Sequence, residues 1–274
     1  MLTVVRWPQL REPLLVAALT GWVDAGFAGA GAMEALGSQL DGAEQFATLD
    51  LTDLLDLQQT RPTARFVKGG LRVIDWPRIA LVAGHAGRDL VLVHGPEPSI
   101  KWPSVAAEIV DAAQRLGVRE AVTVAGMPAL LSHRRPIPVL ATATSRGLAQ
   151  QSGALRADYA GPTGMQTVLQ YAFGVADIDC TGLWAQVPQY VSGSPSPPAV
   201  RAVLSRLAEL FRIDVDLHVL DSRCDAYVAK VEEGLAERPD VGDLVRRLET
   251  ENAQEMPSGD ELVSEIERFL RDET

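Results

Sequence analysis

The sequence has few cysteines and no long apolar run. Its 274 residues include two cysteines, and neither CxxC nor a Cys/His spacing suited to zinc is present. We therefore expect Cys180 and Cys224 to be reduced thiols in a cytoplasmic protein. No apolar run approaches the roughly 20 residues that a membrane helix needs. The N-terminus also lacks the basic and apolar regions of a signal peptide, so no membrane contact is expected.

The familiar signatures of nucleophilic, metal and phosphate chemistry are absent as well. The sequence contains neither GxSxG nor GxxxxGK[ST], and its four histidines show no HExxH or His-x-His spacing. These absences exclude a P-loop and leave no candidate nucleophile. We therefore predict no metal site and no catalytic residue from motifs.

The net charge of −11 is carried by one end of the chain. Acidic and basic side chains balance over residues 1–213, whereas residues 214–274 contain 18 acidic and 7 basic ones. Such a segment repels polyanions, and no basic stripe elsewhere compensates, so nucleic acid is not an expected partner. The acidic segment is either a solvated helical face or a surface for a basic partner.

Apolar strands alternate with helix-like segments along the first 190 residues. This alternation favours an α/β fold with a largely parallel sheet that is covered on both faces. Helices are predicted at 27–40 and 104–116. Strands are predicted at 14–19, 46–51, 66–75, 79–83, 89–93, 121–125, 139–144 and 181–191.

A break rich in proline and serine, SGSPSPP, spans residues 192–198. We predict an α/β core domain over residues 1–195 and an acidic helical segment over residues 196–274. Apolar residues in the second part recur at helical spacing, and Ser258 with Glu261 forms a capping box before the last predicted helix.

The first candidate site is the glycine-rich turn after the first buried strand, LTGWVDAGFAGAGAMEAL, which contains Trp22 and Asp24. A dinucleotide fingerprint reads GxGxxG, whereas this turn has the reverse spacing, GxxGxG. The carboxylate of Asp24 would also repel a pyrophosphate. We therefore predict that the small residues let a helix pack closely on the sheet, and we expect no cofactor.

The second candidate is VHGPEPSIKW, which directly follows another predicted strand. His94, Glu97 and Lys101 bring an acid–base group, a carboxylate and a cation to one strand end. Open α/β sheets bind ligands outside the carboxyl ends of their strands. The same composition is also typical of an ordinary loop stiffened by proline, and the sequence leaves both interpretations open.

The third candidate is YAGPTGMQTVLQY, residues 159–171. Thr163 and Gln166 match a capping box, and Gly164 shapes the start of the helix. A helix N-terminus can bind an anion, although we favour a cap that binds nothing. The candidate cleft built from the three stretches consists of Trp22, Asp24, His94, Glu97, Lys101, Thr163 and Gly164.

Three motifs, GWVDAG, HGPEPSIKW and YAGPTG, occur in this order and resemble the proteasome assembly chaperone family, in the branch of its second chaperone. The similarity covers roughly residues 1–195, and the acidic helical C-terminus resembles the longer bacterial members. The resemblance implies a three-layer α/β sandwich like that of purine nucleoside phosphorylases. It also implies a homo-oligomer, with a trimer as one option.

Eukaryotic members of that family are non-enzymatic scaffolds of the proteasome α-ring. The resemblance therefore implies a non-catalytic protein-interaction or assembly-chaperone-like role, with a proteasome-related or other protein partner. Relatives that dock into proteasome pockets use a C-terminal hydrophobic-Tyr-X tail, whereas this sequence ends in FLRDET, so docking by that route is not expected.

The alternative hypothesis is an enzyme or small-molecule binding protein with a cleft at the carboxyl ends of the strands. Asp24 or Glu97 would then act as a general base and His94 as a proton shuttle. The helix end at Thr163 would hold an anion. By analogy with the fold, the ligand would be nucleoside-like or phosphate-like.

Overall fold

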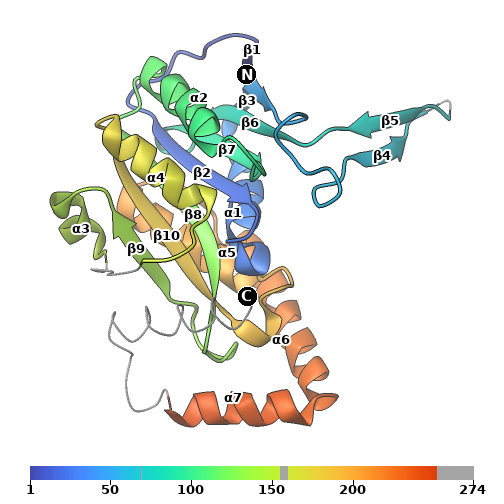
Figure 1. Cartoon of the computed structure of the whole chain (residues 1–274). Coiled ribbons are helices and arrows are strands. Elements are labelled where there is room, and N and C mark those ends of the chain that lie inside the picture. Colours follow the sequence, from blue (N-terminus) through green and yellow to red (C-terminus); the bar gives the residue numbers. More distant parts are fainter. Residues whose placement is uncertain (69, 155–159, 252–274) are drawn as a thin grey trace.

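The computed structural model describes residues 1–68, 70–154 and 160–251. Its centre is an eight-stranded sheet with the order β1-β3-β6-β7-β2-β8-β10-β9 (Figure 1). The four central strands β7, β2, β8 and β10 run parallel, and the outer strands pair antiparallel. The strands are β1 (Leu2–Val4), β2 (Leu14–Thr20), β3 (Asp41–Asp50), β6 (Arg78–His85), β7 (Asp89–Pro96), β8 (Glu120–Ala129), β9 (Val139–Ala143) and β10 (Asp179–Pro188).

Helices cover both faces of the sheet, which confirms the predicted three-layer α/β fold. On one face lie α1 (Ala28–Gly37) and α5 (Pro197–Phe211), and on the other lie α2 (Trp102–Arg115) and α4 (Met165–Val175). The short α3 (Arg146–Ser152) contacts β9 and β10. Single 3-10 turns occur at η1 (Ala25–Phe27), η2 (Gln189–Val191) and η3 (His218–Leu220).

Strand β2 shows why the central strands are apolar throughout. Successive side chains of a strand point to opposite faces, so a strand between two helical layers needs apolar residues at every position. Leu14, Val16 and Ala18 lie in the core beneath α1 and α5. Leu15 and Leu19 lie in the core beneath α2 and α4.

The glycine-rich turn lets α1 approach the sheet closely, as predicted. A Cβ atom at Gly29 would lie 2.8 Å from the carbonyl oxygen of Val124 in β8, a distance that real Cβ atoms essentially never show. The backbone of α1 therefore rests directly on the central strands. Only glycine fits at this point of contact.

Two parts of the chain extend beyond this three-layer body. Strands β4 (Thr63–Phe66) and β5 (Arg72–Asp75) form a separate two-stranded hairpin that projects away from the sheet (Figure 1). Helices α6 (Asp221–Ala236) and α7 (Pro239–Glu251) follow α5 and lie at the bottom of the view in Figure 1. The capping box predicted at Ser258 and Glu261 lies outside the described residues.

Candidate functional site

The carboxylate of Glu97 joins three segments at the carboxyl ends of the strands. Its Oε1 accepts a hydrogen bond from the backbone N–H of Met165 at 2.6 Å, and its Oε2 accepts one from Trp22 N–H at 3.2 Å. The backbone N–H of Glu97 donates to the carbonyl oxygen of Thr20 at 2.7 Å. We call this arrangement of Glu97 with Trp22 and Met165 the strand-end junction. It fixes the loop after β2 and the start of α4 relative to β7.

The junction leaves no room for a side chain at Gly21. A Cβ atom there would lie 2.0 Å from Oε2 of Glu97, so any larger residue would displace the carboxylate. The glycine that begins the GWVDAG motif is therefore required by the approach of Glu97.

Asp24 caps helix α1 from within the same loop. Its Oδ1 accepts a hydrogen bond from Gly29 N–H at 2.7 Å, and its Oδ2 accepts one from Ala30 N–H at 3.2 Å. Burial raises the pKa of Asp24, while these N–H bonds act in the opposite direction. The carboxylate thus occupies the N-terminus of α1, where a nucleotide-binding loop holds its phosphate.

The N-terminus of α4 differs from the prediction. The helix begins at Met165, and its N-cap residue is the buried Gly164, so no side chain caps it. Thr163 lies one residue before this position and is exposed. The predicted cap by Thr163 is therefore wrong. The side chain of Gln166 instead donates to the carbonyl oxygen of Leu19 at 2.6 Å. A carboxylate near a helix N-terminus is favourable, and here Glu97 provides it.

His94 lies apart from this junction. It points to the α1 side of the sheet and lines a pocket of about 470 Å³ beside α1, and no other residue of the predicted cleft lines this pocket. Neither ring nitrogen has a hydrogen-bond partner among the described residues, and burial lowers the pKa of His94. The lining residues are Ala18, Thr20, Ala30, Met33, Glu34, Gly37, Val82, Leu92, His94, Gly95 and Pro96.

The structure brings Trp22, Glu97 and Gly164 to one place. Lys101 precedes α2 in a left-handed conformation with φ 59°, and its exposed side chain makes no polar contact with a described residue. What the loop after β2 presents to solvent is apolar, because the side chains of Trp22 and Phe27 are 54% and 46% exposed.

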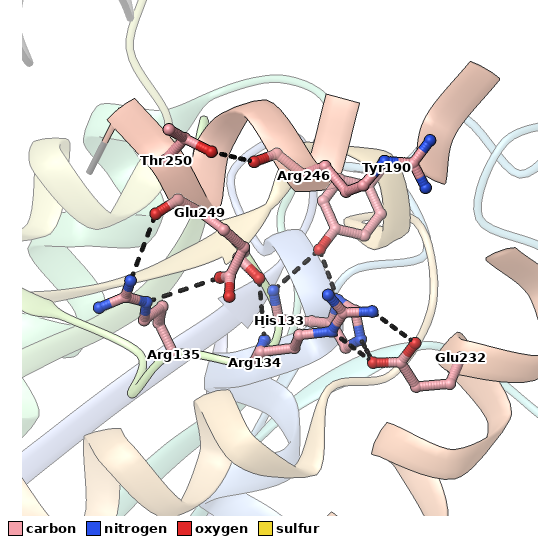
Figure 2. A network of polar contacts seen from close by, with 9 residues as sticks. His133, Arg134, Arg135, Tyr190, Glu232, Arg246, Glu249 and Thr250 are labelled. Atoms are coloured by element: carbon pink, nitrogen blue, oxygen red, sulfur yellow. Dashed lines mark hydrogen bonds and ion pairs between the residues drawn. The ribbon is translucent and has the colours of Figure 1, made fainter. Parts of the chain in front are cut away.

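A second polar network, in the loops that follow the carboxyl ends of β8 and β10, was missed in the sequence (Figure 2). His133 Nε2 lies 3.1 Å from Glu232 Oε1 of α6, and the guanidinium of Arg134 binds both oxygens of Glu232 at 2.6 and 2.8 Å. His133 Nδ1 lies 2.7 Å from the hydroxyl of Tyr190, and Arg135 pairs with Glu249 of α7 at 3.5 Å. This docking network attaches α6 and α7 to the loop after β8.

Charge and burial both shift pKa values within the docking network. The adjacent Arg134 lowers the pKa of Glu232 to about 2, and His133 acts in the same direction. Burial lowers the pKa of His133 even though Glu232 opposes this effect. The tripeptide HRR facing an acidic helical segment was the sequence signal for this contact.

Metal-binding groups, cysteines and membrane-spanning helices were also sought in the described part of the chain. It contains no group of three or more His, Cys, Asp or Glu side chains arranged to hold a metal ion. Cys180 is buried and Cys224 half-buried, and both are free thiols. Among the helices described, none has the length and hydropathy needed to cross a membrane.

Comparison with known proteins supports the fold and the predicted resemblance. A family model described as PAC2 family matches residues 18–235. A PAC2 family protein of Streptomyces avermitilis is 37% identical, with 85% of this chain and 100% of that chain covered and a TM-score of 0.79. A search among curated proteins finds no match.

Two structures from Mycobacterium tuberculosis are also similar. A proteasome-assembly chaperone homologue is 33% identical, covers 85% of this chain and 99% of its own, and has a TM-score of 0.76. A protein of unknown function is 28% identical, covers 92% of this chain and 88% of its own, and has a TM-score of 0.83.

Proposed function

Because the chain belongs to the PAC2 family, we propose that it is a non-catalytic protein-interaction protein with an assembly-chaperone-like role in the cytoplasm. A similar protein, at 33% identity, is described as a proteasome-assembly chaperone homologue, which supports a protein partner of this kind. The two free thiols are typical of a reducing compartment.

The observation that carries this proposal is that both carboxylates at the strand ends bind backbone N–H groups of the protein itself. Asp24 and Glu97 each accept two backbone N–H bonds, so their oxygens hold the loop in shape. The loop fixed in this way exposes the aromatic side chains of Trp22 and Phe27. We call these two side chains the aromatic face.

Exposed aromatic side chains on a rigid loop suit a protein partner better than a small ligand. Aromatic residues are enriched at protein interfaces, where Trp in particular contributes a large share of the binding energy. The loop loses little conformational entropy on binding, since the hydrogen bonds to Asp24 and Glu97 already fix its backbone.

The proposal is tested by affinity capture from the native cell with the double variant Trp22→Ala/Phe27→Ala. We expect captured proteins to be lost at least tenfold relative to the unmodified chain. Tyr171→Ala, which truncates an aromatic side chain that is 72% exposed on α4, is the matched control and should retain them. Purified proteasome α-type subunits, added to the purified chain, test whether ring assembly accelerates.

Equal capture by the double variant and the unmodified chain would show that the aromatic face binds no protein. Capture that depends on this face but excludes proteasome subunits would keep the interaction role and reject a proteasome-related partner.

The second candidate function is binding of a small molecule beside His94. Its pocket has the size of small-molecule sites, and His94 presents ring nitrogens without a partner among the described residues. None of the described lining residues is a lysine or arginine, which disfavours a phosphate. A neutral ligand such as a nucleoside fits this chemistry better.

A thermal-shift comparison of adenosine with AMP tests this second candidate. A nucleoside present at about 100 times its Kd should add about 2.7 kcal/mol of stability. The shift should disappear in His94→Ala and persist in His218→Ala, which removes an exposed histidine elsewhere. No shift with nucleosides, or an equal shift in both variants, would exclude this use of the pocket.

A further inference from the structure

The β4–β5 hairpin is an apolar arm without a covering layer. Its two strands pair only with each other, and Phe66, Leu71, Ile74 and Trp76 are all exposed. An exposed two-stranded hairpin is at best marginally stable by itself. Contiguous exposed apolar side chains of this kind mark an interaction surface.

The hairpin is nevertheless internally ordered. Arg65 pairs with Asp75 across the two strands at 2.6 Å, and the guanidinium of Arg72 lies 5.2 Å from the centre of the Phe66 ring. The N–H of Val67 donates to the carbonyl oxygen of Leu71 at 3.0 Å. The arm thus presents its apolar side chains in a defined arrangement.

The positive charge of the hairpin indicates that its partner is acidic. Residues 61–78 contain five basic side chains and a single acidic one, and that acid, Asp75, is already paired with Arg65. Arg61 and Lys68 have no ion-pair partner among the described residues. An acidic surface with an apolar component is therefore the complement of this arm.

The C-terminal helices of the same chain present an acidic surface with an apolar component. No residue of α6 is buried, and its apolar side chains Cys224, Tyr227, Val228, Val231 and Leu235 are only half-buried. Glu233 and Glu237 are exposed and unpaired within the described part of the chain. Residues 221–251, which include both helices, hold 9 acidic against 5 basic side chains.

Within one molecule these two surfaces are separate. In Figure 1 the hairpin projects away from the body at the upper right, whereas α6 and α7 lie at the bottom of the view. We propose that the β4–β5 hairpin of one copy docks on α6 and α7 of a second copy. Because the two surfaces differ, the contact is heterologous and generates a closed ring or an open chain of copies. It uses neither the aromatic face nor the His94 pocket.

Charge-swapped variants of the full chain test this contact by molar mass in light scattering after size-exclusion chromatography. The unmodified chain should have a multiple of the monomer mass of 29.5 kDa. Arg61→Glu/Lys68→Glu on the hairpin, and separately Glu233→Lys/Glu237→Lys on α6 and its end, should each shift the mass toward 29.5 kDa. The chain carrying all four substitutions restores opposite charges across the contact and should recover the larger mass.

Arg119→Glu/Arg146→Glu is the matched control, because both side chains are exposed and lie outside the hairpin. It should leave the mass unchanged. An unmodified chain that is monomeric, an oligomer unaffected by either pair of reversals, or a quadruple variant that stays monomeric would each overturn the proposed contact. Capture of other proteins through Trp22 and Phe27 would be unaffected by these outcomes, so the two proposals fail separately.

Discussion

The strand-end junction and the docking network both place one glutamate between two donors, but the donors differ. Glu97 accepts hydrogen bonds from the backbone N–H groups of Trp22 and Met165. Glu232 accepts them from the side chains of His133 and Arg134, and its own side chain is 39% exposed. The first contact belongs to the fold of the body, and the second attaches helices to its surface.

The difference determines how each contact responds to its surroundings. Backbone donors are already held by β2 and α4, so the hydrogen bonds to Glu97 require little further ordering. An exposed ion pair must order two long side chains and is screened by salt. The junction should therefore respond to substitution, whereas the docking network should also respond to salt and pH.

The largest effect is expected for Asp24→Ala in the loop after β2. The substitution leaves the N–H groups of Gly29 and Ala30 without their acceptor, and two such losses near a helix N-terminus should cost about 3 kcal/mol. Urea unfolding measures this free energy. Asp24→Asn keeps one acceptor oxygen and should cost less. A loss below about 0.5 kcal/mol for Asp24→Ala would mean that water replaces the carboxylate, since surface changes have effects of this size.

The next largest effect is expected for Glu97→Ala. Removing the carboxylate frees the N–H groups of Trp22 and Met165 and should lower the free energy of unfolding by about 2 kcal/mol. Hydrogen exchange should accelerate at these two amides while α1 stays protected. Glu97→Gln keeps one acceptor oxygen and should protect one of the two amides. Unchanged exchange at both amides in Glu97→Ala would contradict the role assigned to the junction.

The sheet was predictable from the sequence, but the partners of Glu97 were not. Buried parallel strands need apolar residues on both faces, and this requirement is visible in runs such as 14–19 and 89–93. The donors to Glu97 are backbone N–H groups, which nearly every residue carries. The residue types in the sequence therefore do not indicate which groups bind Glu97. The alternation of β7 places His94 on the same face as Leu92, but a sequence does not say which helix covers that face.

A smaller effect on global stability is expected for Glu232→Ala in the docking network. Exposed ion pairs contribute about 1 kcal/mol or less, although the buried Nε2 of His133 also loses its partner. Hydrogen exchange and limited proteolysis should show faster opening of α6 and α7 while β2 and β8 remain protected. Glu233→Ala, the exposed neighbour, is the control and should have no such effect in dilute solution. Opening of the whole body together with α6 would show that the two regions unfold as one unit.

Acid should loosen the same helices, with a smaller effect than the substitution because protonation leaves the side chains in place. The pKa of His133 is lowered in the folded protein, so its contribution is present above the ordinary value of 6.5 and declines as the pH falls through the lowered pKa. The pKa of Glu232 is also lowered, to about 2, so its contribution is present above 4.5 and is lost as the pH falls from 4.5 toward 2.

Both groups therefore act in the same direction, and the protection factors of the amides in α6 and α7, which correct for the intrinsic pH dependence of exchange, should fall on acidification in two stages. The first stage, below pH 6.5, should be absent in His133→Gln, and the second should be absent in Glu232→Gln. Asp24 has the opposite sign, because burial raises its pKa and its contribution is lost as the pH rises. Acid should thus weaken the docking of the helices before it weakens the loop after β2, and simultaneous opening of both would contradict the distinction between the two regions.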